Sequence, residues 1–185
     1  TDAPDRAALE AAGYYTEQLR RAKYALNSEE VRQYFPVDHV VRSVLDIYQE
    51  LFGLTFTSVA RPDVWAPDVR QFTVQDAVTH RAMGTVYLDL FPRPDKYNHF
   101  ADFGIAYARV LPRGTHELPV TAIVGNWPAP TGGEPSLLSH DDVVTFFHEF
   151  GHAIAAITDE SPYVTTGTNN LRQDFVEALS QMLEN

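Results

Sequence analysis

The stretch SHDDVVTFFHEFGHAIAAI, residues 139–157, decides the fold because it predicts a long, buried helix that carries metal-binding residue types. Ser139 and Asp142 form a near capping box, and the acidic residues of the first turn complement the helix dipole. The helix is expected to run to about Ile157. Its apolar residues, which indicate burial, are Phe146, Phe147, Phe150, Ile154 and Ile157.

Within this helix, the segment His148-Glu149-Phe150-Gly151-His152 has the spacing of a zinc site. Residues four apart on a helix share a face, with Cβ atoms about 5–6 Å apart, so both imidazoles can reach one ion. Glu149 points beside that ion, where a carboxylate can take a proton from an attacking water and pass it to a leaving amine. The segment can also arise by chance on a solvated helix face. Its apolar surroundings favour the metal, because buried His and Glu need partners.

The third protein ligand of a catalytic zinc must be His, Asp or Glu, because the chain has no cysteine. Glu177 is the best candidate, since it lies on the next expected helix, after a loop that lets the two helices fold back on each other. Asp174 and Glu184 compete on the same helix, one turn before and about two turns after Glu177. Only one of the three is expected to face the metal.

The remaining pattern predicts an α+β, predominantly helical fold with a small, mostly antiparallel sheet. Helices are expected over Pro4–Leu26, from Ser28 to before Pro36, over Val37–Phe52, and from about Leu171 to the end of the chain. Strands are expected over Leu54–Val59, Phe72–Val78, Thr85–Phe91, Ile105–Leu111 and Val120–Val124.

The composition argues against several classes of protein. A formal net charge of −11 disfavours a nucleic-acid binder and a protein bound to anionic membranes. No apolar run approaches the roughly 18 residues of a membrane span, and Thr1–Arg6 does not resemble a signal peptide. The helical pattern still runs at Asn185 and there is no initiator Met, so we interpret the chain as a fragment. A cytoplasmic location is expected, with a periplasmic or exported one as the alternative; the oligomeric state stays open.

The motif and several distant segments together resemble the thimet oligopeptidase and oligopeptidase A family of zinc metallopeptidases. Phe147–Ala153 resembles that family's active-site helix, and Asp174–Asn185 resembles the segment that supplies its third zinc ligand. Similar segments elsewhere are Tyr34-Phe35-Pro36, Val64-Trp65, Tyr87–Arg93, Lys96-Tyr97, Asn126-Trp127-Pro128 and Leu137–Asp141. The resemblance therefore covers nearly the whole chain.

The resemblance implies one Zn²⁺ held by His148, His152 and Glu177, with Glu149 as general base, in a zincin-like region that cleaves internal bonds of short peptides. Residues 1–185 would form part of one catalytic domain, helical over 1–53, sheet-containing over 54–125, and carrying the zinc-site helices over 139–185. Ala155 stands where family members usually have a His that is not a ligand. The family's large N-terminal helical part and its Tyr- and Gly-rich C-terminal loop are absent. The alternatives are a zinc-binding but catalytically incompetent fragment, and a metal-free helical binding module.

Four further residues are secondary candidates. Ser180 is expected either to orient a ligating imidazole or simply to pack within its helix. Gly167 and Thr168 would contact a substrate backbone, or only form a turn and a helix N-cap. His99 would line the substrate cleft, or lie on the surface like most isolated histidines.

Overall fold

The computed structural model describes residues 6–25 and 27–184, and its elements follow the order expected from the sequence. The helices are α1 (Arg6–Tyr24), α2 (Ser28–Arg32), α3 (Val37–Phe52), α4 (His140–Ile157) and α5 (Gln173–Gln181), with 3-10 turns at Val164–Thr166 and Thr168–Asn170. The strands are β1 (Leu54–Ser58), β2 (Arg70–Asp76), β3 (Ala82–Asp89), β4 (Ala101–Ala106), β5 (Arg109–Val110), β6 (His116–Glu117) and β7 (Val120–Val124). The expected combination of helices and a sheet is confirmed. In the part described, no helix is both long and apolar enough to cross a membrane.

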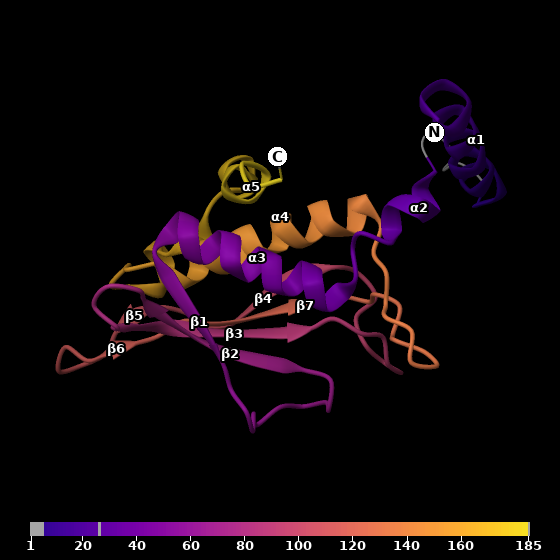
Figure 1. The fold of residues 1–185 in the computed structure, drawn as a ribbon. Helices are drawn as coiled ribbons and strands as arrows, with labels where there is room; N and C mark the ends of the chain where they lie inside the picture. The colour runs from indigo at the N-terminus through magenta and orange to yellow at the C-terminus, as the bar shows by residue number, and fades with distance from the viewer. Residues whose placement is uncertain (1–5, 26, 185) are drawn as a thin grey trace.

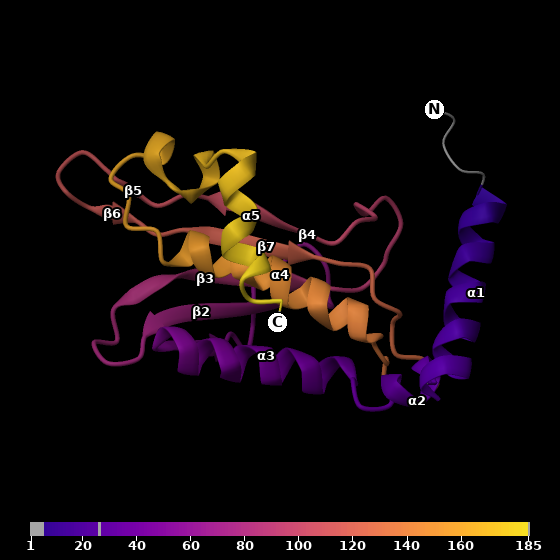
Figure 2. The ribbon, with the colours of Figure 1, turned by 90° about the horizontal axis from the view of Figure 1, so that it is seen from above.

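Five strands form one sheet in the order β1-β2-β3-β7-β4 (Figure 1). Strands β3 and β7 are parallel, and the other neighbouring pairs are antiparallel. Helices α3 and α4 cover one face of this sheet, and α5 crosses α4 on the side away from the sheet (Figures 1 and 2). Strand β4 forms one edge of the sheet and lies below α4, so an edge strand and two crossing helices meet at one place.

The core between α3, α4 and the sheet fixes the rotation of α4 about its own axis. Phe146 and Phe150 are fully buried, and the Phe150 ring lies 4.8 Å from the ring of Tyr48 on α3. The Tyr48 hydroxyl donates a hydrogen bond of 2.8 Å to the carbonyl oxygen of Phe147, and burial raises the pKa of Tyr48. Each such side chain stabilises the fold by roughly 1.5–3 kcal/mol. The core therefore holds this face of α4 and leaves its histidine-bearing face for α5.

A buried carboxylate joins the end of β3 to the loop that follows it. Asp89 accepts hydrogen bonds from both terminal nitrogens of Arg93, at 2.6 and 2.7 Å, and from the indole N–H of Trp65 at 2.8 Å. The Lys96 ammonium, almost fully buried, lies 2.8 Å from the same carboxylate and donates to the carbonyl oxygens of Asp89, Phe91 and Gly125. Burial raises the pKa of Asp89, but these hydrogen bonds outweigh it and lower the value to about 2. The role of Asp89 is structural.

Several expected boundaries are wrong. The strand expected over Ile105–Leu111 is divided: β4 ends at Ala106, and β5 pairs with β6 in a separate ribbon that was not expected. The cause is an irregularity between Gly104 and Ala106, where the Tyr107 ring occupies the place of a side chain at Gly104.

Other elements differ only at their ends. Strands β2 and β3 begin two and three residues before the expected positions, because the residues there still pair in the sheet: Arg70 and Gln71 with Leu88 and Tyr87, and Ala82 and Gly84 with Gln75 and Val74. The last helix ends at Gln181. A tighter turn follows it, in which the N–H groups of Leu183 and Glu184 donate to the carbonyl oxygens three residues earlier, those of Ser180 and Gln181. The expected ends of the first helix, Pro4 and Leu26, lie outside the described residues.

Candidate metal centre

Helix α4 presents both histidines of the motif towards α5. It begins at a complete capping box, in which the Ser139 hydroxyl accepts from the Asp142 N–H at 3.1 Å and the Asp142 carboxylate accepts from the Ser139 N–H at 2.8 Å. His148 and His152 lie one turn apart and are partly buried, with side chains 22% and 19% exposed. The capped, core-anchored helix thus fixes where the two imidazoles point.

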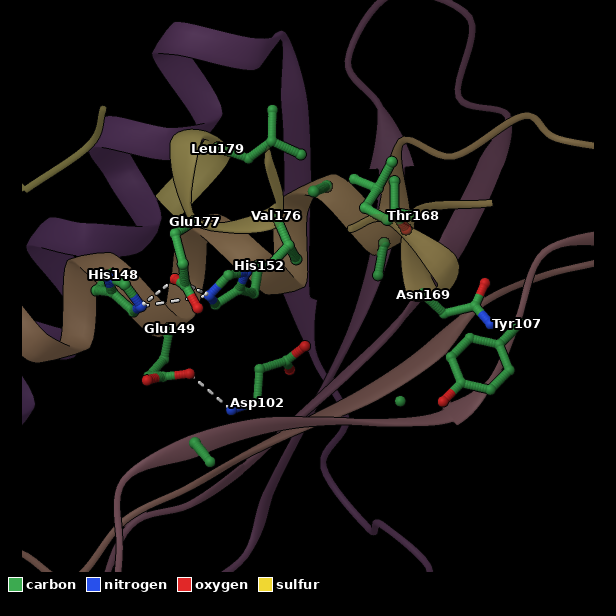
Figure 3. A pocket seen from close by; sticks show the side chains of 15 residues that line it. Asp102, Tyr107, His148, Glu149, His152, Thr168, Asn169, Val176, Glu177 and Leu179 are labelled. Atoms are coloured by element: carbon green, nitrogen blue, oxygen red, sulfur yellow. Dashed lines mark hydrogen bonds and ion pairs between the residues drawn. The ribbon is translucent and has the colours of Figure 1, made fainter. Parts of the chain in front are cut away.

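Three side-chain atoms converge between α4 and α5 (Figure 3). Glu177 Oε2 lies 3.1 Å from His148 Nε2 and 3.2 Å from His152 Nε2, and the two Nε2 atoms are 3.3 Å apart. Ligands of a tetrahedral ion with bonds of about 2.0–2.1 Å stand roughly 3.3–3.4 Å from one another. The three atoms therefore have the size of one face of a zinc tetrahedron, and two imidazoles with one carboxylate are ligands that zinc accepts.

Glu184 contacts the other side of the His148 ring. Its Oε1 lies 2.6 Å from His148 Nδ1. Because an ionised carboxylate only accepts hydrogen bonds, Nδ1 must carry the proton, and the neutral ring then presents its lone pair at Nε2. This is the tautomer that binds a metal through Nε2. Of the three acids that the sequence left in competition for the metal, Glu177 alone faces both Nε2 atoms, whereas Glu184 contacts His148 from behind and Asp174 is exposed.

The position of Glu177 depends on a close approach of the two helices. Ser180 is fully buried, and its hydroxyl lies 3.0 Å from Glu177 Oε2 and from the Glu177 carbonyl oxygen. Ser180 therefore contacts a carboxylate rather than an imidazole. A Cβ on Gly151 would lie only 2.9 Å from the Ser180 Cα, so α5 reaches this position because residue 151 has no side chain.

Glu149 points into the cleft beside the three converging atoms (Figure 3). Its Oε2 accepts a hydrogen bond of 2.8 Å from the backbone N–H of Asp102 on β4. Burial raises the pKa of Glu149, opposed by this hydrogen bond and by the nearby histidines. A carboxylate with a raised pKa is the better proton acceptor near neutral pH. The edge strand therefore positions the residue that the sequence assigned as general base.

The Asp102 side chain is a feature that the sequence reasoning missed. Its Oδ1 accepts a hydrogen bond from the hydroxyl of Thr121, a fully buried residue on β7. Burial raises the pKa of Asp102 to about 7, and the charge of Glu149 adds to this effect. The only available signal was an acidic residue within the otherwise apolar segment Phe100–Ala106.

A cleft of about 370 Å³ contains these residues. Thr168 and Asn169 line it, together with Tyr107, so Thr168 lies where the sequence placed a substrate contact. Gly167 and His99 are not among its lining residues. The His99 ring instead lies 5.5 Å from that of Tyr97.

Gly167 has a structural task next to the cleft. The Asp159 carboxylate accepts from the Thr168 N–H at 2.7 Å and from the Ser161 N–H at 2.8 Å, which holds the loop between α4 and α5. A Cβ on Gly167 would lie 2.4 Å from Asp159 Oδ2. The glycine thus lets the loop close on Asp159 and places Thr168 and Asn169 at the cleft.

Comparison with known families matches residues 12–185 to peptidase family M3. The chain belongs to peptidase family M3. The sequence of this M3 chain is 36% identical to saccharolysin of Saccharomyces cerevisiae over 178 residues. The match covers 92% of the chain and 25% of the yeast protein. It is 35% identical to the thimet-like oligopeptidase of Dictyostelium discoideum, covering 92% of the chain and 26% of that protein. Identity to oligopeptidase A of Escherichia coli is 33%, covering 93% of the chain and 25% of the relative. The chain spans about a quarter of the length of these M3 relatives, and the expected family is confirmed.

Proposed function

We propose that this chain supplies the zinc site and the general base of a metallopeptidase that hydrolyses internal bonds of short peptides. The convergence of His148 Nε2, His152 Nε2 and Glu177 Oε2 within 3.1–3.3 Å is the observation that carries the proposal. Membership of family M3 supports a metallopeptidase, and the oligopeptidase names of the relatives support peptides as substrates.

The side chains around the site divide the chemistry between them. His148, His152 and Glu177 would hold the zinc ion, with Glu184 fixing the His148 tautomer and Ser180 contacting the Glu177 carboxylate. Bound zinc would polarise the scissile carbonyl group and lower the pKa of a water molecule to about 7.

Glu149 performs the proton transfers in this proposal. It lies beside the three converging atoms rather than among them, so its carboxylate stays free to accept the proton of the attacking water. It then returns that proton to the nitrogen of the departing amine as the peptide C–N bond breaks, so Glu149 regains its starting protonation state. The hydrogen bond from the Asp102 N–H holds Glu149 in the cleft in its charged form.

The decisive experiment compares three proteins on a quenched fluorescent peptide: wild type, Glu149→Gln and His152→Ala. Each is prepared both as this chain and as the natural protein that contains it. Wild type should bind one zinc ion and lose cleavage on chelation. Glu149→Gln should keep the zinc, and its cleavage rate should fall by about 10²–10⁴-fold. His152→Ala should lose both zinc binding and cleavage.

Two results would change the proposal. Undiminished cleavage by Glu149→Gln would remove the general-base role. Stoichiometric zinc binding by this chain without cleavage, while the longer protein cleaves, would favour the second candidate: a zinc-binding segment that is catalytically incompetent alone. The coverage of only a quarter of the M3 relatives is the observation that keeps this candidate. Anomalous scattering at the zinc edge would locate the ion in either case.

A further inference from the structure

The cleft beside the metal centre contains one carboxyl group that the proposed chemistry does not use. Its acidic lining residues are Asp102, Glu149 and Glu177, and no Lys or Arg is among the described residues that line it. Glu177 belongs to the metal group and Glu149 to proton transfer. Asp102 remains without a catalytic task.

Asp102 is held in a defined position rather than lying on a flexible surface. Its carboxyl group is fixed from below by the Thr121 hydroxyl, and its own backbone N–H binds Glu149. Figure 3 shows the carboxyl group rising from β4 into the cleft, with Glu149 and His152 on one side and Tyr107 on the other. Asp102 and Glu149 therefore line the same cleft, and a substrate bound at Glu149 would lie close to Asp102.

The surroundings of Asp102 favour a cationic partner. A carboxylate that is largely surrounded by protein is poorly solvated, and an opposite charge at hydrogen-bonding distance restores the lost interaction. Among the described residues no Lys or Arg side chain lines the cleft, and Asp102 is not one of the three residues that would hold the zinc ion, so a ligand would have to bring the opposite charge to it. The cleft residues Ala101, Ala155 and Ala156 have small side chains, which leaves room for a long side chain of the ligand.

We propose that Asp102 is a specificity-determining residue that receives a cationic group of the peptide substrate, a lysine or arginine side chain or a free amino terminus, close to the scissile bond. The inference rests on the proposed peptidase function. It assigns to this chain a preference that neither the metal ligands nor Glu149 would produce.

The test uses Asp102→Asn, which keeps the shape of the side chain and an acceptor for Thr121 but removes the negative charge. Asp174→Asn is the matched control, because it removes the same charge from an exposed position of α5 that does not line the cleft. The substrates are quenched peptides blocked at both ends that carry lysine or norleucine at each position around the cleaved bond. A second pair compares a free with an acetylated amino terminus.

In the natural protein that contains this chain, wild type should prefer the lysine peptide by about 10–100-fold in kcat/KM at one position, mainly through KM. The preference should fall to about one in Asp102→Asn and persist in Asp174→Asn. If the responsive pair is instead the free and acetylated termini, the cation is the amino terminus. Equal lysine preference in wild type and Asp102→Asn would overturn the proposal, and so would the absence of any cation preference in wild type.

Failure of the peptidase function can be told apart from failure of this inference. If wild type cleaves none of the peptides, the same fluorescent pairs are bound to the zinc-loaded Glu149→Gln protein and followed by anisotropy. If the cationic peptide binds more tightly than the uncharged one, and the difference disappears when Asp102→Asn is combined with Glu149→Gln, the subsite is supported even though no peptide is cleaved. Equal binding of the charged and uncharged peptides contradicts it.

Discussion

The substitution Gly151→Ala should separate the two helices that carry the candidate metal ligands. A Cβ there would lie 2.9 Å from the Cα of Ser180, 3.2 Å from the carbonyl oxygen of Leu179 and 3.3 Å from Cδ1 of Leu183. Carbon atoms in contact prefer about 3.5–4.0 Å, so α5 must retreat by roughly 0.6–1 Å. Because the nearest atom belongs to the backbone, no change of rotamer relieves the contact.

This retreat is large compared with the tolerance of a metal site, where ligand distances vary by only about 0.2 Å. Glu177 lies one turn before Ser180 and would move with it, away from both histidines. We expect zinc affinity to fall by about 10–100-fold, as for changes in groups that support metal ligands. Stability should change less, because overpacking costs about 1–3 kcal/mol and the better helix propensity of alanine returns roughly 1 kcal/mol.

The assay is zinc competition against a chromophoric chelator, with thermal unfolding of the metal-free protein recorded in parallel. Gly13→Ala is the control, since Gly13 lies on α1 and a Cβ there meets no atom within 4 Å. It should leave zinc affinity unchanged. If Gly151→Ala bound zinc as tightly as wild type, the close approach of α5 would not be what sets the position of Glu177.

Substitutions at three further positions test other parts of the structure. Glu184→Ala should weaken zinc binding by about 10-fold, and Glu184→Gln by less, because the amide oxygen still accepts from His148 Nδ1; chelator competition measures both. Lys96→Met should cost about 3–5 kcal/mol in urea unfolding, because it leaves three buried carbonyl oxygens and part of the Asp89 charge unpaired. Asp102→Asn should remove a pH dependence of the folding stability. The pKa of Asp102 is about 7 in the folded state against an ordinary value of 3.8, so the folded state holds this proton more tightly than the unfolded state. Wild-type stability relative to the variant should therefore fall as pH rises from about 4 to about 7, by at most about 4 kcal/mol. Urea unfolding of the metal-free proteins at pH 4.5 and pH 8 would show it, and an equal difference at both values would contradict the raised pKa.

The sequence predicted those features that depend on local spacing. The capping box at Ser139, the apolar face of α4 and the paired histidines are all read within one helix, and the structure has each of them. The proposed role of Glu177 needed a second helix, and the sequence left Asp174, Glu177 and Glu184 in competition for that role. What spacing could not decide was which acid meets which ring nitrogen, because that depends on how far α5 lies from α4.

Features that depend on strand pairing were beyond the sequence. Asp102 meets Glu149 only because β4 pairs with β7 at the sheet edge, far from its sequence neighbours. The irregularity after Gly104 likewise depends on the Tyr107 ring, so the sequence predicted one strand over Ile105–Leu111 where β4 ends at Ala106 and β5 begins at Arg109. His99 is exposed and lies beside Tyr97, which fits the surface alternative, and its position follows from a loop, not from a periodic element.

The three parts of the candidate metal centre are supported by unequal amounts of packing, and a bound ion would act on the least supported part. Helix α4 is anchored by buried aromatic residues and β4 by the sheet, whereas α5 packs mainly on α4 and leaves Phe175 and the following Met182 exposed, at 55% and 66%. An ion shared by Glu177 and the two histidines would join the least supported element to the most supported one. Binding that requires the docked helix stabilises docking by RT ln(1 + [L]/Kd), which is about 4 kcal/mol at 1,000 times Kd. The Ser180 contact, the absence of a side chain at Gly151 and the bound metal would then act on the same movement, the approach of α5 to α4.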